Sequence, residues 1–231
     1  MKTARLTPRL SCAAEFVRRG AVFADVGTDH AYLPIFLLEE GKISRAISSD
    51  INEGPLKNAE TNARLHGLSD KIEFLLADGA AALAGRGVTD IAICGMGGEL
   101  IADIIEGAPQ LKDGSVRLIL QPMTKRAHLC RYLASRGFAI LDEKYTKEGK
   151  HSYVTLLAEY AGEPYEISAL EAEIGYPSYD FSENTERRAY ALARLAAITK
   201  SALGKAAGGN PDKDEEELAA AIKNLLKGDL E

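Results

Sequence analysis

Acidic and glycine residues follow the first apolar run of the chain, which spans residues 21–26. The residues able to do chemistry there are Asp25, Gly27, Asp29, His30 and Tyr32. A glycine lets the backbone turn sharply and approach a ligand closely. Because this segment lacks the GxGxxG pattern, a nicotinamide or flavin dinucleotide is poorly supported. A single glycine beside carboxylates instead favours a cofactor without a pyrophosphate, whose polar parts are an amine, a carboxylate and a ribose.

Acidic residues also follow the second and third apolar runs. Asp50 ends the second run and precedes Ile51, and a carboxylate at this place can accept hydrogen bonds from both hydroxyls of a ribose. Asp50 lies 25 residues beyond Asp25, a plausible length for one strand–helix–strand step. After the third run come Asp78 and Gly79, where the carboxylate could accept a hydrogen bond from the exocyclic amine of an adenine.

A glycine-rich segment follows the fourth apolar run. It contains Gly95 and Met96, and three of the four residues from 95 to 98 are glycines. Glycines let a backbone wall lie against a flat ligand, and the methionine adds a polarisable contact. Acidic or glycine-rich residues therefore follow four successive runs. This joint pattern is more specific than any one of its members.

Each of these features also has a purely structural interpretation. An aspartate after a strand is often only the cap of the next helix, and the glycines between 95 and 98 can form a simple turn. His30 can be a satisfied, half-buried histidine. Tyr32 can be a core residue and not a ring on which a base stacks.

The apolar runs alternate with stretches of helical periodicity, and this alternation predicts how the candidate residues are positioned. Strands are expected at 21–26, 45–50, 72–76, 90–94 and 116–121, with an antiparallel pair at 138–144 and 153–159. Helices are expected at 32–40, 52–66, 99–106 and 125–136. Repeated alternation of strand and helix forms a parallel sheet with helices on both faces. Ligands bind such a sheet at the carboxyl ends of its strands, which is the edge that carries the candidate residues.

The composition changes after residue 162. Two long helical patterns, at 185–205 and 214–227, are separated by the turn-forming stretch Gly-Gly-Asn-Pro at 208–211. Their spacing predicts an antiparallel, coiled-coil-like hairpin in which one apolar face meets the other. The two expected faces are Leu192, Leu195, Ala196 and Thr199 against Leu218, Ala221, Ile222 and Leu225. We therefore expect an α/β fold: a Rossmann-like catalytic domain with a mostly parallel, seven-stranded sheet at 1–162, and a C-terminal helical hairpin at 163–231.

The overall composition is that of an ordinary globular protein. Of the 231 residues, 46% are hydrophobic and 27% are charged, and the formal net charge is −6. A nucleic-acid partner would therefore have to meet local positive patches, because the chain as a whole is negative. No apolar leader is found at the N-terminus and no apolar run approaches 18 residues, so we expect a cytoplasmic protein with no membrane partner.

Cysteine usage gives no indication of a disulfide framework or a metal centre. The three cysteines form no CxxC pair, and we expect no metal ion. Cys94 lies inside an apolar run and is expected to be a small core residue and not a catalytic thiol. The sequence identifies no protein partner.

Five segments of the chain resemble one known family. They are ADVGTDHAYLP at 24–34, SDINEGPLKNAETN at 49–62, ADG at 77–79, ICGMGGELI at 93–101 and LILQPM at 118–123. Their order and spacing are similar to those of the bacterial tRNA (adenine-22-N1)-methyltransferase family, TrmK. The resemblance covers about 160 residues strongly and the helical tail only in its architecture.

The resemblance implies a class I methyltransferase that uses S-adenosylmethionine to methylate N1 of an adenine in the D-arm of tRNA. By position, it implies a cofactor site of Asp25, Gly27, Asp50, Ile51, Asp78, Gly79, Gly95 and Met96. It further implies that the catalytic candidates Asp29, His30 and Tyr32 face the target base, together with Gln121 and Pro122. Methyltransferases of exocyclic amines usually carry an Asn/Asp-Pro-Pro-aromatic motif after the fourth strand. Its replacement here by Gly-Met-Gly-Gly favours a ring nitrogen as the acceptor.

The implied acceptor sets the demands on the catalytic residues. N1 of adenine carries a lone pair at neutral pH and can attack a sulfonium methyl group directly, so a strong general base is not required. The methylated ring is cationic, and a carboxylate such as Asp29 would stabilise the developing charge. N1 lies on the base-pairing edge, so the base must be unpaired or flipped, and Tyr32 could hold it by stacking.

A tRNA substrate requires local positive charge. Residues 1–20 contain five basic residues and one acidic residue, and residues 125–150 contain seven and three, so each region carries a net charge of +4. The phosphate-contacting candidates in these regions are Arg9, Lys125 and Arg126. An ordinary solvated face explains the same charges equally well.

Other functions stay open at this point. One is a methyltransferase of a small molecule or a protein, because the same cofactor residues would serve it. Another is a nucleotide- or RNA-binding module without catalysis. An NAD-dependent oxidoreductase is the least supported, because the glycine fingerprint is missing.

Overall fold

The computed structural model describes residues 4–176, 181 and 184–228. Its strands are β1 (Val22–Val26), β2 (Arg45–Asp50), β3 (Ile72–Leu76), β4 (Asp90–Gly97), β5 (Arg117–Thr124), β6 (Phe138–Glu148) and β7 (His151–Tyr160). Its helices are α1 (Pro8–Phe16), α2 (Tyr32–Glu39), α3 (Glu53–Leu65), α4 (Gly98–Glu106), α5 (Arg126–Ser135), α6 (Ala169–Ile174), α7 (Thr185–Ala207) and α8 (Lys213–Gly228). Two short 3-10 helices are η1 (Ala81–Leu83) and η2 (Pro109–Leu111).

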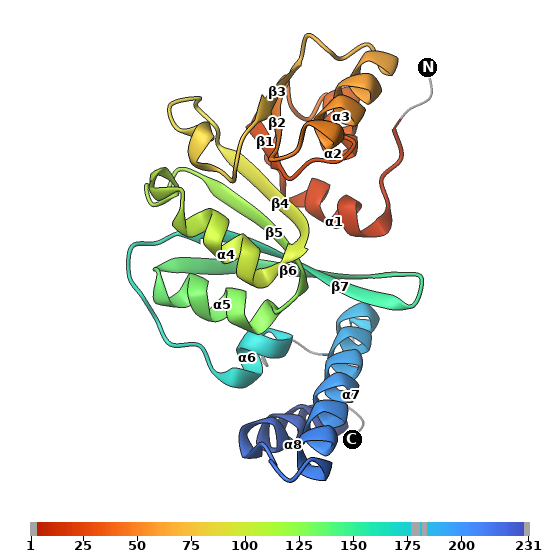
Figure 1. Ribbon diagram of the computed structural model, residues 1–231, viewed down its shortest axis with the longest axis vertical. Helices are drawn as coiled ribbons and strands as arrows, with labels where there is room; N and C mark the ends of the chain where they lie inside the picture. The colour runs from red at the N-terminus through yellow and green to blue at the C-terminus, as the bar shows by residue number, and fades with distance from the viewer. Residues whose placement is uncertain (1–3, 177–180, 182–183, 229–231) are drawn as a thin grey trace.

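The seven strands form one sheet in the order β3-β2-β1-β4-β5-β7-β6 (Figure 1). Strands β1 to β5 pair with one another in parallel, and β7 is antiparallel to both β5 and β6. The strand order reverses beside β1, with β2 and β3 on one side and β4 and β5 on the other. Ligands bind such sheets at this reversal, outside the carboxyl ends of the strands. The expected mostly parallel, seven-stranded sheet is confirmed.

Two apolar clusters cover the two faces of the sheet. On one face, α1, α2 and α3 pack on side chains such as Phe23 and Ala92. On the other face, α4 and α5 pack on side chains such as Ile91, Ile93 and Leu118. Because the central strands are covered on both faces, they read in the sequence as short continuous apolar runs. The carboxyl ends of β1 and β4 are therefore held by a packed core on either side.

Two helices were not anticipated from the sequence. Helix α1 is nine residues long, begins at Pro8 and packs against β5, β6 and β7. Helix α6 is six residues long and starts with a capping box in which Ser168 and Glu171 bond each other's backbone. Short helices contain too few turns to show a clear period, and both are held by contacts with distant parts of the chain.

The helical tail is a hairpin whose inner face differs from the expected one. Helices α7 and α8 pack on each other and on α6, at the end of the molecule beyond β6 and β7 (Figure 1). Leu195 of α7 and Leu218, Ile222 and Leu225 of α8 lie in the apolar cluster of the hairpin as expected, and Ala221 is half-buried. Leu192, Ala196 and Thr199 of α7 are exposed, however, because the inner face of this helix joins Leu195 to Ala191 and Ile198 and is therefore rotated around the helix axis.

Contacts outside the hairpin cause this rotation, and the periodicity of the sequence does not reveal them. Helix α7 packs on α6, β6 and β7 as well as on α8, so its buried side is set by all of these partners. Within the expected tail at 163–231, residues 177–180, 182–183 and 229–231 lie outside the described residues.

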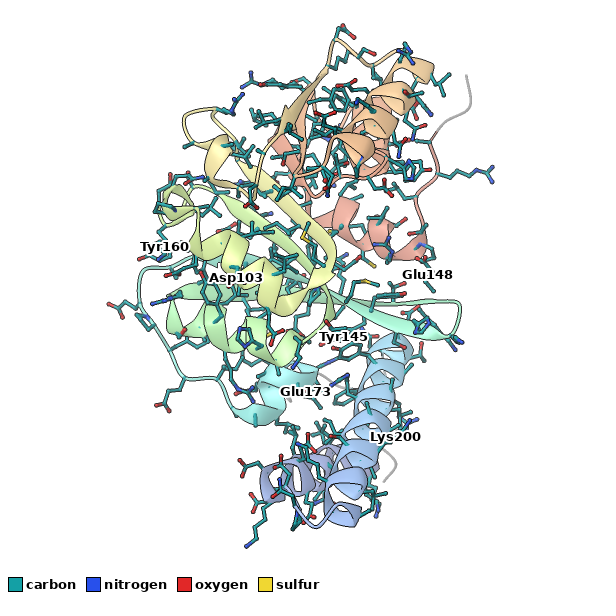
Figure 2. All side chains as sticks on the ribbon, viewed as in Figure 1. Asp103, Tyr145, Glu148, Tyr160, Glu173 and Lys200 are labelled. Carbon is teal, nitrogen blue, oxygen red and sulfur yellow. The ribbon has the colours of Figure 1, made fainter. Side chains whose placement is uncertain are left out.

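A buried ion pair joins the sheet to the tail. The side chains of Arg126 in α5 and Glu143 in β6 are 4% and 3% exposed and form a salt bridge. Arg126 also donates hydrogen bonds to the carbonyl oxygens of Glu171 and Ala172 in α6. Figure 2 shows Tyr145, whose hydroxyl bonds Glu143, where the sheet meets α6 and α7. The tail and the sheet therefore share a core at this junction. The domain boundary at residue 162 stays a prediction.

We expect Glu143→Ala to lower the free energy of unfolding by about 3–5 kcal/mol, because it leaves the Arg126 guanidinium buried without its anion. The matched control is Glu106→Ala, which removes the half-exposed partner of Arg136, and should cost about 1 kcal/mol or less. Urea unfolding of both variants measures the difference. Equal losses would show that the buried pair does not hold the junction.

Candidate active site

A pocket of about 260 Å³ opens at the carboxyl end of β1. Its walls come from α1, the β1–α2 loop and the end of β4. The expected residues that line it are Arg9, Asp25, Gly27, Asp29, His30, Tyr32 and Gly95. It is also lined by residues that were not expected there, which are Leu10, Thr28, Ala31, Leu33 and Cys94. Residues from three separate parts of the sequence are thus brought into one site.

Asp25 is the buried carboxylate of the pocket. Its residue is 9% exposed, and burial raises the pKa of its carboxyl to about 6, against a hydrogen bond from Thr28 that lowers it. Burial disfavours a charge that has no partner, so a cationic group placed beside Asp25 would be bound strongly. Thr28 was missed from the sequence. It is 3% exposed, and its hydroxyl also accepts a hydrogen bond from the Ala31 N–H at 3.1 Å.

Gly27 makes a turn whose left-handed backbone conformation favours glycine. Its φ is +79°, and its N–H donates to the carbonyl oxygen of Ser49 at 2.8 Å. A Cβ on Gly27 would collide with the terminal methyl group of Met96. Met96 therefore lies over the turn, and the two residues expected to contact a cofactor meet each other from β1 and β4.

The β1–α2 loop presents three polar or aromatic side chains together. His30 Nε2 lies 3.3 Å from Asp29 Oδ2, and the rings of His30 and Tyr32 are 5.1 Å apart between centroids. The Asp29 side chain is 67% exposed and Tyr32 is 47% exposed, so Tyr32 is not a core residue. Ala31 stands between them with a φ of +52°, a conformation that is strained for a residue with a Cβ and that concentrates at functional sites.

The acidic residues after β2 and β3 lie at neighbouring strand ends and do not line the pocket itself. Asp50 is paired in register with Leu76, and its Oδ1 accepts a hydrogen bond from the Asn52 N–H at 2.7 Å. This bond orients the carboxylate at the strand end. Ile51 is 60% exposed beside it. Asp78 is exposed, two residues beyond the end of β3.

The glycine-rich segment forms the end of β4 and the start of α4, and its glycines have different surroundings. Gly95 has a φ of +83° and lines the pocket, where the Nη1 atom of Arg9 lies 3.7 Å from the position that a Cβ would take. Gly98 faces away from the pocket, because a Cβ there would collide with the carbonyl group of Lys125. Gly79, after β3, has a φ of +69° and lies against Ile104 of α4. Of these three glycines, only Gly95 therefore lines the pocket.

Cys94 is not a simple core residue as expected, because it is half-buried and lines the pocket. Burial and the nearby Asp25 raise the pKa of its thiol, against the nearby Arg9 that lowers it. The thiol is therefore neutral at physiological pH and is no nucleophile.

Gln121 does not face an open site, whereas Pro122 lines a separate pocket together with Lys125 and Arg126. Gln121 is fully buried, and its Nε2 donates to the carbonyl oxygen of Arg9 at 2.8 Å and to Thr155 Oγ1 at 2.7 Å. Its Oε1 accepts a hydrogen bond from Arg9 Nη1 at 3.1 Å. Pro122 is buried at the end of β5. In the structure Gln121 contacts α1, whereas the resemblance implied that it faces the target base.

The expectation that Arg126 contacts phosphate is wrong, because its side chain is buried in the ion pair described above. Other cations of the two basic regions are already paired with carboxylates. These pairs are Arg18–Asp90, Lys144–Glu15 and Arg136–Glu106. Lys125 is exposed and lies 3.7 Å from Glu99 Oε1, and Lys147 and Lys150 are exposed in the β6–β7 hairpin. The positive surface is thus smaller than the residue counts indicate.

The described part of the chain has neither a candidate metal site nor a candidate membrane span. No group of three or more His, Cys, Asp or Glu side chains is arranged to hold a metal ion. None of its helices has the length and apolar character needed to cross a membrane.

Comparisons with known proteins agree with this fold. Residues 6–156 match the family model of a methyltransferase domain. The tRNA (adenine(22)-N(1))-methyltransferase of Bacillus subtilis is 37% identical over 159 residues, which are 69% of this chain and 67% of that protein.

Two solved structures extend the similarity over almost the whole chain. One is a Streptococcus pneumoniae protein, proposed to be a tRNA (m1A22) methyltransferase, in complex with S-adenosyl-L-methionine. It is 34% identical with a TM-score of 0.83, covering 96% of this chain and 100% of that one. The other is TrmK of M. capricolum in complex with S-adenosyl-homocysteine, which is 26% identical with a TM-score of 0.76 and covers 96% of both chains.

The fold and its pocket define a Rossmann-like, class I methyltransferase. The chain belongs to the tRNA (adenine(22)-N(1))-methyltransferase family, as the resemblance of its motifs implied.

The pKa of Asp25 predicts how cofactor affinity depends on pH. Below pH 6 the carboxyl is protonated and no longer attracts a cation, so the affinity for S-adenosylmethionine should fall as the pH is lowered. If only the ionised form binds, affinity at pH 5.5 should be about four-fold weaker than at pH 7.5. Titration calorimetry at both pH values measures this change. Asp25→Asn should make the affinity for S-adenosylmethionine independent of pH. Asp70→Asn, a control at an exposed position, should keep the pH dependence. A wild type whose affinity does not change with pH would exclude Asp25 from the cofactor site.

Proposed function

We propose that this chain transfers the methyl group of S-adenosylmethionine to N1 of adenine 22 in tRNA. The observation that carries the proposal is the pocket beside β1. Its inner wall has the buried Asp25 and the tight turn at Gly27, and its rim has the exposed Asp29, His30 and Tyr32. Membership of the tRNA (adenine(22)-N(1))-methyltransferase family supports adenine N1 as the acceptor.

The residues present fit the cofactor. S-adenosylmethionine, when bound, supplies an electrophilic methyl group on a sulfonium centre. Asp25 is a buried carboxylate that suits the cationic methionine end, and the turn at Gly27 lets the backbone approach it. Asp50 suits the ribose hydroxyls, because the Asn52 N–H orients its carboxylate at the end of β2. Asp78 is exposed at the next strand end and suits the adenine amine.

The rim residues suit the target base. Tyr32 offers a half-exposed ring on which a flipped adenine can stack. Asp29 is exposed beside His30, and its carboxylate would stabilise the positive charge that the ring acquires as N1 forms its bond to the methyl carbon. N1 forms the new bond with its own lone pair and carries no hydrogen, so no proton has to be removed for the transfer. The electron pair of the broken carbon–sulfur bond stays on sulfur. Positioning of base and methyl group can account for about 7–11 kcal/mol of the barrier.

The position of the helical tail also favours a macromolecular substrate over a small one. No residue beyond Gly95 lines the pocket in the described part of the chain, so α7 and α8 do not close over it. A pocket that stays open at its rim can admit a base that is still attached to RNA. A tRNA substrate also supports the expected cytoplasmic location.

The test is to incubate the protein with methyl-labelled S-adenosylmethionine and an unmodified tRNA transcript, and then to digest the RNA and identify the labelled nucleoside. We expect 1-methyladenosine with the adenine-22 transcript and background label with a transcript that carries guanine at position 22. Label in another nucleoside, or equal label in both transcripts, would contradict the proposal.

Asp29→Ala tests the division of the site into cofactor and substrate ends. The single-turnover rate should fall at least about ten-fold while the dissociation constant of S-adenosylmethionine stays unchanged, because the proposed interaction strengthens only as charge develops on the base. Asp70→Ala, at an exposed position outside the pocket, is the control. A native rate in Asp29→Ala would leave Asp29 as a structural residue of the loop.

A further inference from the structure

The peptide group that joins His30 to Ala31, in the β1–α2 loop, is held from both sides by side chains. Its N–H donates to Thr28 Oγ1 at 3.1 Å, and its carbonyl oxygen accepts a hydrogen bond from Asn62 Nδ2 at 2.9 Å. Asn62 belongs to α3, which lies beside α2 on the same face of the sheet (Figure 1). It lies outside the lining of the pocket, so it reaches the site only through this loop.

The residue that follows the bonded carbonyl is strained. Ala31 has a φ of +52°, and in the described part of the chain Lys125 is the one other residue besides glycines with a positive φ. A rotation about the N–Cα bond of Ala31 to a negative φ would relieve the strain. The same rotation would swing the carbonyl and the N–H of the peptide group away from Asn62 and Thr28. These two hydrogen bonds therefore oppose a relaxation that the backbone itself favours.

The two ends of the loop are fixed separately. At the start, the N–H groups of Gly27 and Thr28 both donate to the carbonyl oxygen of Ser49 in β2, at 2.8 and 3.0 Å. At the end, the carbonyl oxygen of Ala31 accepts a hydrogen bond of 3.0 Å from the first turn of α2. A relaxation of φ is therefore confined to the short stretch between these anchors, which carries the rim side chains.

This relaxation would separate the side chains at the rim of the pocket. It moves Asp29 and His30 relative to Tyr32, which is fixed in the first turn of α2. In the structure the rings of His30 and Tyr32 are 5.1 Å apart between centroids, and His30 Nε2 lies 3.3 Å from Asp29 Oδ2. All three residues line the pocket. The bonded peptide group thus keeps a carboxylate, an imidazole and a phenol ring together.

The strain and the two bonds are of similar size. The left-handed conformation of one residue with a Cβ lowers its population by about 5- to 30-fold. One hydrogen bond raises the population of the bonded conformation by about 2- to 10-fold. Two such bonds together balance the strain, whereas one bond is too weak to do so.

We propose that Asn62 is a positioning residue, whose hydrogen bond to the His30 carbonyl keeps Ala31 in its strained conformation. It thereby holds the rim side chains in the arrangement that receives the target adenine. The inference rests on the proposed function, in which the base binds at this rim. A carbonyl oxygen only accepts hydrogen bonds, so the effect depends on the donor of the Asn62 amide.

Asn62→Ala removes the donor. The single-turnover rate of tRNA methylation should fall about five-fold or more, because the one remaining bond does not balance the strain. The dissociation constant of S-adenosylmethionine should stay unchanged, because Gly27 and Thr28 are still bonded to β2. The matched control is Asn58→Ala, an exposed asparagine one turn earlier in α3, which should keep the native rate.

Ala31→Gly distinguishes positioning from a merely structural role of Asn62. Glycine adopts a positive φ at little cost, so a loop with glycine at this place has little strain to relieve. The loss of rate caused by Asn62→Ala should therefore be at least about three-fold smaller in a chain that also carries Ala31→Gly. An equal loss in both backgrounds would overturn the inference, because Asn62 would then act through the packing of α3.

Hydrogen exchange of the Ala31 amide gives a readout that needs neither RNA nor methyl transfer. Ala31 is 1% exposed and its N–H is bonded to Thr28. In Asn62→Ala this amide should exchange about five-fold faster or more, while the amides of β4 keep their rates, because only the loop relaxes. Unchanged exchange at Ala31, or equal acceleration throughout β4, would overturn the inference even if tRNA is methylated. A wild type that does not methylate tRNA would overturn the proposed function, and the exchange measurement would still test the hold of Asn62 on the loop.

Discussion

The chain leaves β1 through a turn in which Gly27 takes a left-handed backbone conformation, and the site is built around this constraint. Gly27 lies under Met96 with its N–H bound to Ser49 of β2, so β1, β2 and β4 are locked together at their carboxyl ends. The turn places Asp25 just inside the packed core and Asp29 just outside it. One carboxylate is therefore buried with a raised pKa and the other is exposed, and this difference gives the pocket an inner end and a rim.

The parts of the chain that surround the turn close the site from outside the parallel sheet. Helix α1 carries Arg9 to the pocket, and the buried Gln121 and the β6–β7 hairpin hold it there. The same hairpin carries Glu143, whose buried pair with Arg126 anchors α6 and the helical tail. The antiparallel end of the sheet thus connects the cofactor end of the site with the tail, although the tail itself does not reach the pocket.

The sequence predicted the sheet and the strand-end residues well, because both depend on local patterns. Buried strands read as apolar runs, and parallel strands bring their carboxyl ends to one edge, so Asp25, Gly27 and Tyr32 could be placed in one site. The contact between Arg9 and Gln121 could not be predicted, because these residues lie 112 positions apart. Arg126 looked like a surface cation for the same reason, since only the fold reveals that Glu143 and α6 cover it.

The most direct measurement of this account is a crystal structure of the protein with S-adenosylhomocysteine, the product of methyl transfer. The account predicts that the amino-acid end of the ligand lies at Asp25, with the ribose at Asp50. A ligand bound away from the carboxyl end of β1, with neither Asp25 nor Asp50 in contact, would contradict it.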